Sequence, residues 1–166
     1  VRSMQDAPEK KRNVLTKNFN MWVDMREDGY MNMSKWNEAT IEPLDKNNED
    51  KTDDFMRNFV GEECILGVDL STKLDLTSIA FEFKKDDIYY TCQHSWMPEE
   101  TYEKRLREGK FRFDLWKEQG FLTVTPGSVI DYGFITDYIH MCEKDYGIKV
   151  KEICYDPMNA THWVSE

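Results

Sequence analysis

The sequence predicts an α/β domain built on a mixed β-sheet, because strand-like and helix-like patterns alternate along its second part. Three apolar segments separated by turn-forming residues follow one another over residues 64–96, which is typical of an antiparallel meander. A further apolar segment, residues 150–155, comes after helical patterns, and a parallel strand needs a connection of that kind. We therefore expect a three-stranded meander extended by a parallel strand, with helices flanking the sheet.

Length and charge limit the class of protein. The 166 residues suffice for one domain with an appendage and are too few for two enzymatic domains. The formal net charge of -10 argues against a nucleic-acid partner, because Lys and Arg supply most of the affinity for phosphates. That objection is weaker for a metal-dependent enzyme, in which carboxylates hold cations that meet the phosphate.

The cysteines, the apolar runs and the chain ends indicate the context. The four cysteines are widely spaced and have no histidine pair nearby, so we expect reduced thiols, with neither a zinc site nor disulfides. Neither a membrane-span-length apolar run nor a signal-peptide core is present, which predicts a cytoplasmic location. Val1 replaces an initiator methionine, and a helix capped by Asn159 starts just before the chain stops, so we expect a piece of a longer protein.

Residues 1–60 are expected to form a helical linker region. An apolar stripe at helical spacing predicts a helix over residues 8–25, which either covers the domain's own core or docks on a neighbouring domain. That stripe consists of Leu15, Phe19, Trp22 and Val23. Ser34 is expected to cap a short helix through Ala39. Residues 44–54 are polar and acidic, so we expect a linker there and a domain boundary near Gly61.

The first strand of the predicted sheet ends on an acid. Residues 64–70 form a nearly continuous apolar run that Asp69 interrupts, and a carboxylate at a buried strand needs a hydrogen-bond, ionic or metal partner. Residues 71–75 have turn composition, and residues 77–83 alternate like the returning strand of a hairpin. The stretch alone supports equally a strand-end aspartate bonded to turn amides and a metal ligand.

The third strand, residues 88–96, leads into helical patterns. Pro98 opens a helix that Gly109 ends. This region holds a basic concentration that could follow a phosphate backbone, although interleaved glutamates favour a solvated helix face. The basic residues are Lys104, Arg105, Arg107, Lys110 and Arg112. A helical turn at residues 115–119 and a short extended segment at residues 121–125 follow.

The last helix and strand of the sequence bring a second acid. Asp131 is expected to cap a helix that ends at Gly147. One apolar stripe along this helix is predicted to pack in the core and not to bind a cofactor. The stripe consists of Ile135, Tyr138, Ile139, Cys142 and Tyr146. The strand at residues 150–155 is followed directly by Asp156.

Asp69 and Asp156 therefore stand at the ends of two buried-type strands. If these strands are adjacent and parallel, both carboxylates lie at the same edge of the sheet. Hard oxygen ligands suit Mg²⁺ or Mn²⁺, and two such ions can activate a water and stabilise the leaving oxygen of a phosphodiester.

Four ordered motifs resemble the nuclease domain of bacteriophage terminase large subunits, which package and cut viral DNA. The resemblance runs from about Gly61 to Glu166, and its motifs are GVDLSTKLDLTSIA, HSWMPEE, FDLWKEQGFLTVTPGSVIDYGFI and EICYDPMNATHWVSE. Residues 15–24, LTKNFNMWVD, are similar to the segment that joins the ATPase and nuclease domains of that family.

The resemblance implies an RNase H-like fold, here C-terminally truncated, and a two-metal endonuclease that cuts concatemeric double-stranded DNA during genome packaging in the host cytoplasm. It implies that Asp69 and Asp156 are the catalytic metal ligands for two Mg²⁺ or Mn²⁺ ions. Asp75 matches a family position with a supporting role at most. The family's partners are the terminase small subunit and the portal, and no membrane is implied.

Two departures from the family pattern reduce the activity that we expect. Family members carry a third acid nearer their C-terminus, beyond the last residue of this sequence. None of the eight glycines lies in a G-x-x-x-x-G-K-S/T arrangement, so we expect no ATP hydrolysis. The 166 residues alone should bind metal weakly and cut DNA little.

Two rival interpretations remain. The sequence GVDLST invites an ATP-binding domain of the kinase or chaperone type, but such phosphate-binding turns need a glycine, and residues 71–77 contain none. The other rival is a non-catalytic interaction module that docks a partner through Trp22, Trp36 and the acidic segment. Substitution of Asp69 by Asn distinguishes this module from a nuclease, because the module should be indifferent to it, whereas a nuclease core should lose its divalent-ion site.

Overall fold

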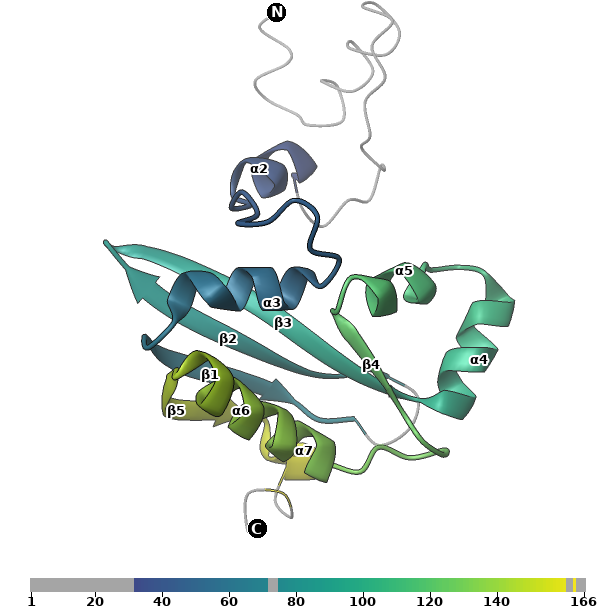
Figure 1. Ribbon diagram of the computed structural model, residues 1–166. Coiled ribbons are helices and arrows are strands. Elements are labelled where there is room, and N and C mark those ends of the chain that lie inside the picture. The colour runs from purple at the N-terminus through teal and green to yellow at the C-terminus, as the bar shows by residue number, and fades with distance from the viewer. Residues whose placement is uncertain (1–31, 72–74, 161–162, 164–166) are drawn as a thin grey trace, which may run out of the picture. The chain divides into compact units, whose positions relative to one another are not determined.

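A computed structural model describes residues 32–71, 75–160 and 163 of the chain (Figure 1). The chain divides into two compact units, Val1–Glu42 and Pro43–Glu166. The helix expected over residues 8–25 lies outside the described residues.

The described part of the first unit contains helix α2 (Met33–Glu38). Its N-cap is Asn32, whose side-chain oxygen accepts hydrogen bonds from the backbone N–H groups of Ser34 and Lys35 at 3.1 and 3.2 Å. The expectation that Ser34 caps this helix is therefore wrong. Asn32 lies two positions before Ser34. From there its side-chain oxygen can accept hydrogen bonds from the first backbone N–H groups of the helix, which have no partner within the helix.

The second unit is organised on a five-stranded mixed sheet with the order β4-β3-β2-β1-β5. The strands are β1 (Glu63–Asp69), β2 (Thr77–Lys85), β3 (Ile88–Pro98), β4 (Leu122–Thr125) and β5 (Lys149–Tyr155). Strands β1, β2 and β3 pair antiparallel, whereas β5 pairs parallel to β1 and β4 pairs parallel to β3. The predicted meander and the parallel strand beside β1 are both confirmed.

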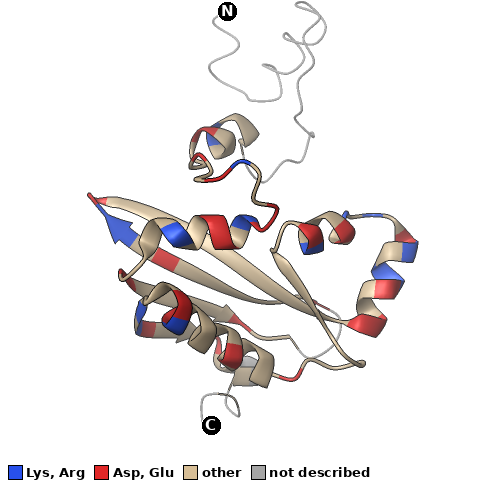
Figure 2. Ribbon diagram, viewed as in Figure 1, with Lys and Arg blue, Asp and Glu red and all other residues tan. Residues whose placement is uncertain are grey.

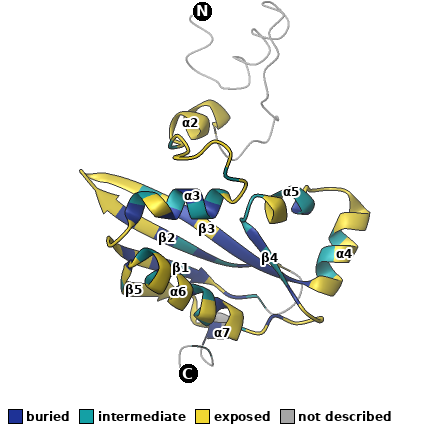
Figure 3. Cartoon of the chain, in the orientation of Figure 1, coloured by how far each residue is buried: buried dark blue, intermediate teal, exposed yellow. Residues whose placement is uncertain are grey.

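Buried residues alternate with more exposed ones along β1 and β2, so the two faces of the sheet differ in burial, and Figure 3 colours each residue by its burial. Alternate residues of β1 and β2, such as Leu66 and Phe81, are fully buried and form the core with α3 (Lys51–Met56), the 3-10 helix at Arg57–Phe59 and α6 (Gly133–Tyr146). The residues between them, such as Gly67 and Ser78, remain partly exposed on the other face. A smaller cluster of Met97, Phe113 and Leu122 packs at α5 (Phe113–Glu118) and β4.

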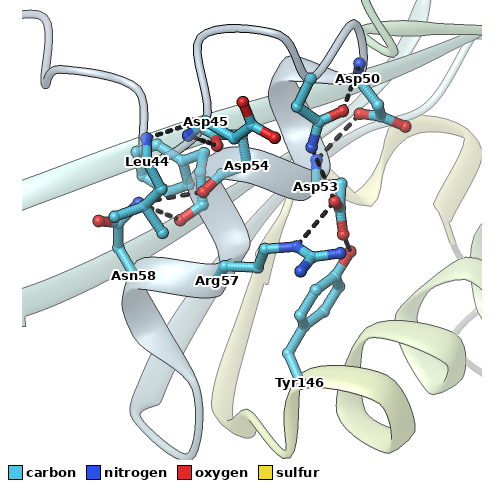
Figure 4. Close-up of polar contacts among 10 residues, drawn as sticks. Leu44, Asp45, Asp50, Asp53, Asp54, Arg57, Asn58 and Tyr146 are labelled. Atoms are coloured by element: carbon cyan, nitrogen blue, oxygen red, sulfur yellow. Dashed lines mark hydrogen bonds and ion pairs between the residues drawn. The ribbon is translucent and has the colours of Figure 1, made fainter.

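The acidic segment before β1 is structured and belongs to the same compact unit as the sheet. Helix α3 starts at Lys51 and buries Met56 in the core, so residues 44–54 are not simply a linker. The carboxylate of Asp54, 4% exposed, accepts hydrogen bonds from the backbone N–H groups of Leu44 and Asp45 at 2.9 and 2.7 Å (Figure 4). Composition alone places the boundary near Gly61, whereas the structure groups residues 43–60 with the sheet.

The predicted helix ends are found where glycine takes a left-handed backbone. Helix α4 (Glu99–Glu108) ends at Gly109 and α6 ends at Gly147, with φ of 63° and 64°. The expected stripe of α6 faces the core. The Asp131 carboxylate accepts a hydrogen bond from the backbone N–H of Gly133 at 2.9 Å, next to the start of α6.

The final described helix, α7 (Pro157–Ala160), starts directly after β5 and Asp156. The expected cap at Asn159 is therefore wrong, because proline fits the first helical position and the helix begins at Pro157, with Asn159 inside it. None of the helices in the described ranges is both long and apolar enough to span a membrane.

Candidate active site

The two predicted acidic residues lie at the same edge of the sheet. Asp69 is the last residue of β1, and Asp156 directly follows the last residue of β5. The parallel register pairs Val68 with Tyr155, so the next residues along both strands are the two aspartates. The adjacency that the sequence predicts is thus confirmed, while the metal-binding role of the two carboxylates stays a prediction.

Both aspartates line an open depression of about 580 Å³ on the less covered face of the sheet. Cross-strand pairs build this surface: Ser78 lies opposite Asp69, and Ala80 and Cys154 lie on either side of Gly67. The side chains beside the aspartates are therefore small. A Cβ atom placed on Gly67 would have no other atom within 4 Å, so the surface here is low and accessible.

Three polar side chains connect in a network beside the carboxylates. The Ser78 and Ser95 hydroxyl oxygens lie 2.8 Å apart, and the Gln93 side-chain Nε2 donates to Ser78 at 3.3 Å and to Ser95 at 3.2 Å. Ser78 and Gln93 line the depression, and Ser95 is only 5% exposed. Sequence reasoning does not single out these residues, although the alternation of residues 77–83 already places Ser78 on the outward face.

Asp75 takes no part in this depression. It is exposed in the connection between β1 and β2 and is absent from the residues that line the surface near Asp69. Within the described ranges, no group of three or more His, Cys, Asp or Glu side chains is arranged to hold a metal ion. Asp69 and Asp156 are the two acidic residues among those that line the depression.

Basic and acidic residues are interleaved along α4 (Glu99–Glu108) (Figure 2). Arg105 pairs with Glu108 at 3.6 Å and Arg107 pairs with Glu103 at 3.7 Å. Arg112 pairs with Asp114 at 2.8 Å. These pairs favour the solvated-face interpretation. A DNA contact by Lys104, Arg105, Arg107, Lys110 and Arg112 stays a prediction.

The thiols have no part in a disulfide, as expected. All four cysteines are free, and three of them are buried. Burial raises the pKa of Cys64 to about 11 and those of Cys92 and Cys142 to about 12, so these thiols stay protonated near neutral pH.

Sequence comparison places the chain among known proteins. The family model described as terminase large subunit, endonuclease domain, matches residues 2–166. Protein YmfN of Escherichia coli (strain K12) is 31% identical over 155 residues, which cover 88% of this chain and 31% of that protein. The large terminase subunit of Enterobacteria phage HK97 is 34% identical over 70 residues, which cover 42% of this chain and 14% of that protein.

The fold has a solved counterpart. The crystal structure of the HK97 bacteriophage large terminase matches with a TM-score of 0.62 and 21% identity, covering 98% of this chain and 30% of that one. This likeness shows that the fold is the RNase H-like one of terminase nucleases. The chain spans less than a third of the length of the curated relatives it matches.

Proposed function

Because the chain belongs to the family of terminase large subunit endonuclease domains, we propose that it is the part of a phage or prophage terminase that cuts double-stranded DNA with divalent metal ions. The observation that carries this proposal is the placement of Asp69 and Asp156 at the ends of adjacent parallel strands. Both carboxylates open onto one accessible depression, where a DNA strand can approach them.

The residues present suit Mg²⁺ or Mn²⁺. Asp69 and Asp156 supply hard oxygen ligands, and such ions usually bind through a few carboxylates, waters and substrate phosphate oxygens. Two bound ions would supply the chemistry of activating water for in-line attack and of stabilising the leaving oxygen. Asp69 and Asp156 would orient the cations at the sheet edge, and the small side chains near Gly67 would let the phosphate backbone come close.

A complete site needs a third acid, which the longer natural protein would supply. We infer that the 166 residues alone bind metal weakly and cut DNA little, because two carboxylates give few of the ligands that such a cation requires. In the natural protein the substrate would be concatemeric DNA in the host cytoplasm. The small subunit and the portal would be its partners during packaging.

The test is plasmid cleavage in Mn²⁺ by the full natural polypeptide. We expect the wild type to cut and Asp69→Asn to lose at least 100-fold in rate, because a ligand of the metal site has been removed. Glu82→Gln is a matched control, since Glu82 is an exposed acid on β2 outside the depression, and it should cut like the wild type. Equal cutting by wild type and Asp69→Asn would refute the metal site. A folded wild type that does not cut would instead favour the interaction module.

A further inference from the structure

Ser78, on β2, lies opposite Asp69 of β1 and lines the same depression as Asp69 and Asp156. We propose that Ser78, oriented by Ser95 and Gln93, donates a hydrogen bond to a phosphate oxygen of the DNA strand that lies in the depression. This inference rests on the proposed nuclease function. It assigns Ser78 as a substrate-binding residue and Ser95 and Gln93 as residues that position it.

Counting hydrogens in the network gives the direction of each bond. Ser95 is 5% exposed, and a buried hydroxyl hydrogen is costly when it has no acceptor. Gln93 already donates to Ser95 through Nε2, so the acceptor for the Ser95 hydrogen is the Ser78 oxygen at 2.8 Å. Ser95 is therefore the donor to Ser78.

The Ser78 oxygen then has both lone pairs engaged. It accepts from Ser95 and from the Gln93 amide at 3.3 Å, and a hydroxyl has only two acceptor positions. The hydroxyl hydrogen of Ser78 is not used within the network. Because Ser78 is partly exposed and lines the depression, this hydrogen can be donated to a ligand there. Ser78 thus presents a donor without acceptor capacity, which selects a ligand rich in acceptors.

A phosphodiester oxygen fits this donor and its surroundings. Phosphate oxygens accept hydrogen bonds from serine and glutamine side chains in protein–DNA interfaces, and such contacts position the strand without reading its sequence. The low surface at Gly67 and Ala80 leaves room for a sugar–phosphate backbone next to the donor. A neutral hydroxyl also adds no positive charge that would compete with a cation for Asp69.

Binding of duplex DNA to the full natural polypeptide in Ca²⁺ tests this role, because Ca²⁺ replaces the catalytic ion. We expect Ser78→Ala to weaken DNA binding about 5- to 10-fold, the effect of one lost hydrogen bond to a charged group. Its Mn²⁺ affinity should equal that of the wild type, and Ser78→Thr should restore binding because it keeps the hydroxyl.

A second variant reverses the network. In Gln93→Glu the carboxylate only accepts, so it takes the Ser78 hydrogen and adds a negative charge beside the phosphate, and we expect a larger loss than in Ser78→Ala. Thr91→Ala is the matched control, since Thr91 is exposed on the same face of β3 outside the depression. Unchanged DNA binding by both Ser78→Ala and Gln93→Glu would overturn the proposal. Failure of the wild type to cut DNA would count against the nuclease function alone. The role of Ser78 is tested separately, by comparing how tightly the wild type and Ser78→Ala bind duplex DNA in Ca²⁺.

Discussion

At the scale of single residues, His94 is a buried titratable side chain of the sheet. It lies on β3 with 5% exposure, its ring stacks on Tyr138 at a centroid distance of 4.3 Å, and Nε2 lies 2.9 Å from the Thr123 hydroxyl. Burial lowers the pKa of His94 to about 4, because the imidazolium would lose its hydration. His94 is therefore a neutral core residue at pH 7.

This burial predicts a loss of stability in mild acid. The pKa of His94 is lower in the folded state than its ordinary value of 6.5, so its contribution is complete above pH 6.5 and is lost as the pH falls toward 4. Between pH 7 and pH 4.5, the free energy of unfolding of the wild type should fall about 2 kcal/mol more than that of His94→Gln. Urea denaturation at both pH values measures this. His140→Gln, on the exposed side of α6, is the control, and equal pH dependence of wild type and His94→Gln would contradict the account.

At the scale of elements, α3 and α6 are joined by a hydrogen bond from the Tyr146 hydroxyl to the Asp53 carboxylate at 2.6 Å (Figure 4). Arg57 also donates to Asp53 at 2.8 Å. Burial acts to raise the pKa of Asp53, but hydrogen bonds from Tyr146, Arg57 and Asn48 outweigh it, so the pKa lies below its usual value. The ionised carboxylate thus links the acidic segment to the helix that covers the core.

Removing this link should destabilise the domain. Tyr146→Phe deletes the hydroxyl that donates to Asp53, and we expect a loss of about 1.5 kcal/mol in the free energy of unfolding. Tyr132→Phe is a matched control, because the Tyr132 hydroxyl is buried and has no hydrogen-bond partner among the described residues. That variant should be neutral or slightly stabilised in urea denaturation. Equal losses in the two variants would show that the bond to Asp53 is unimportant.

The elements show what local pattern can and cannot predict. Apolar alternation and glycine stops predict the strands and α4 and α6 well, since these signals are local. For residues 44–54 the sequence predicts a linker, because α3 is too short to give a clear helical pattern. The buried carboxylate of Asp54 accepts a hydrogen bond from the backbone of Leu44, and composition does not reveal this contact. The remaining features depend on how distant strands pair. The placement of Asp69 and Asp156 is predictable from the parallel topology, whereas the network of Ser78, Gln93 and Ser95 depends on the register between β2 and β3.

At the scale of the whole molecule, the chain has an RNase H-like fold and belongs to the family of terminase large subunit endonuclease domains. Its formal net charge of -10 opposes binding to DNA through basic side chains alone, so the proposed function requires cations between the carboxylates and a phosphate backbone. The proposal of a nuclease therefore depends on one claim, which is that Asp69 and Asp156 act together on the same metal site.

Mn²⁺ binding to the full natural polypeptide tests that claim most directly. Calorimetry on the wild type, Asp69→Asn, Asp156→Asn and the double variant gives a double-mutant cycle. We expect each single variant to weaken Mn²⁺ binding at least 10-fold. The double variant should weaken it by less than the product of the two single effects, because the carboxylates share a site. Wild-type affinity in either single variant, or effects that simply multiply, would contradict a shared metal site at this edge of the sheet.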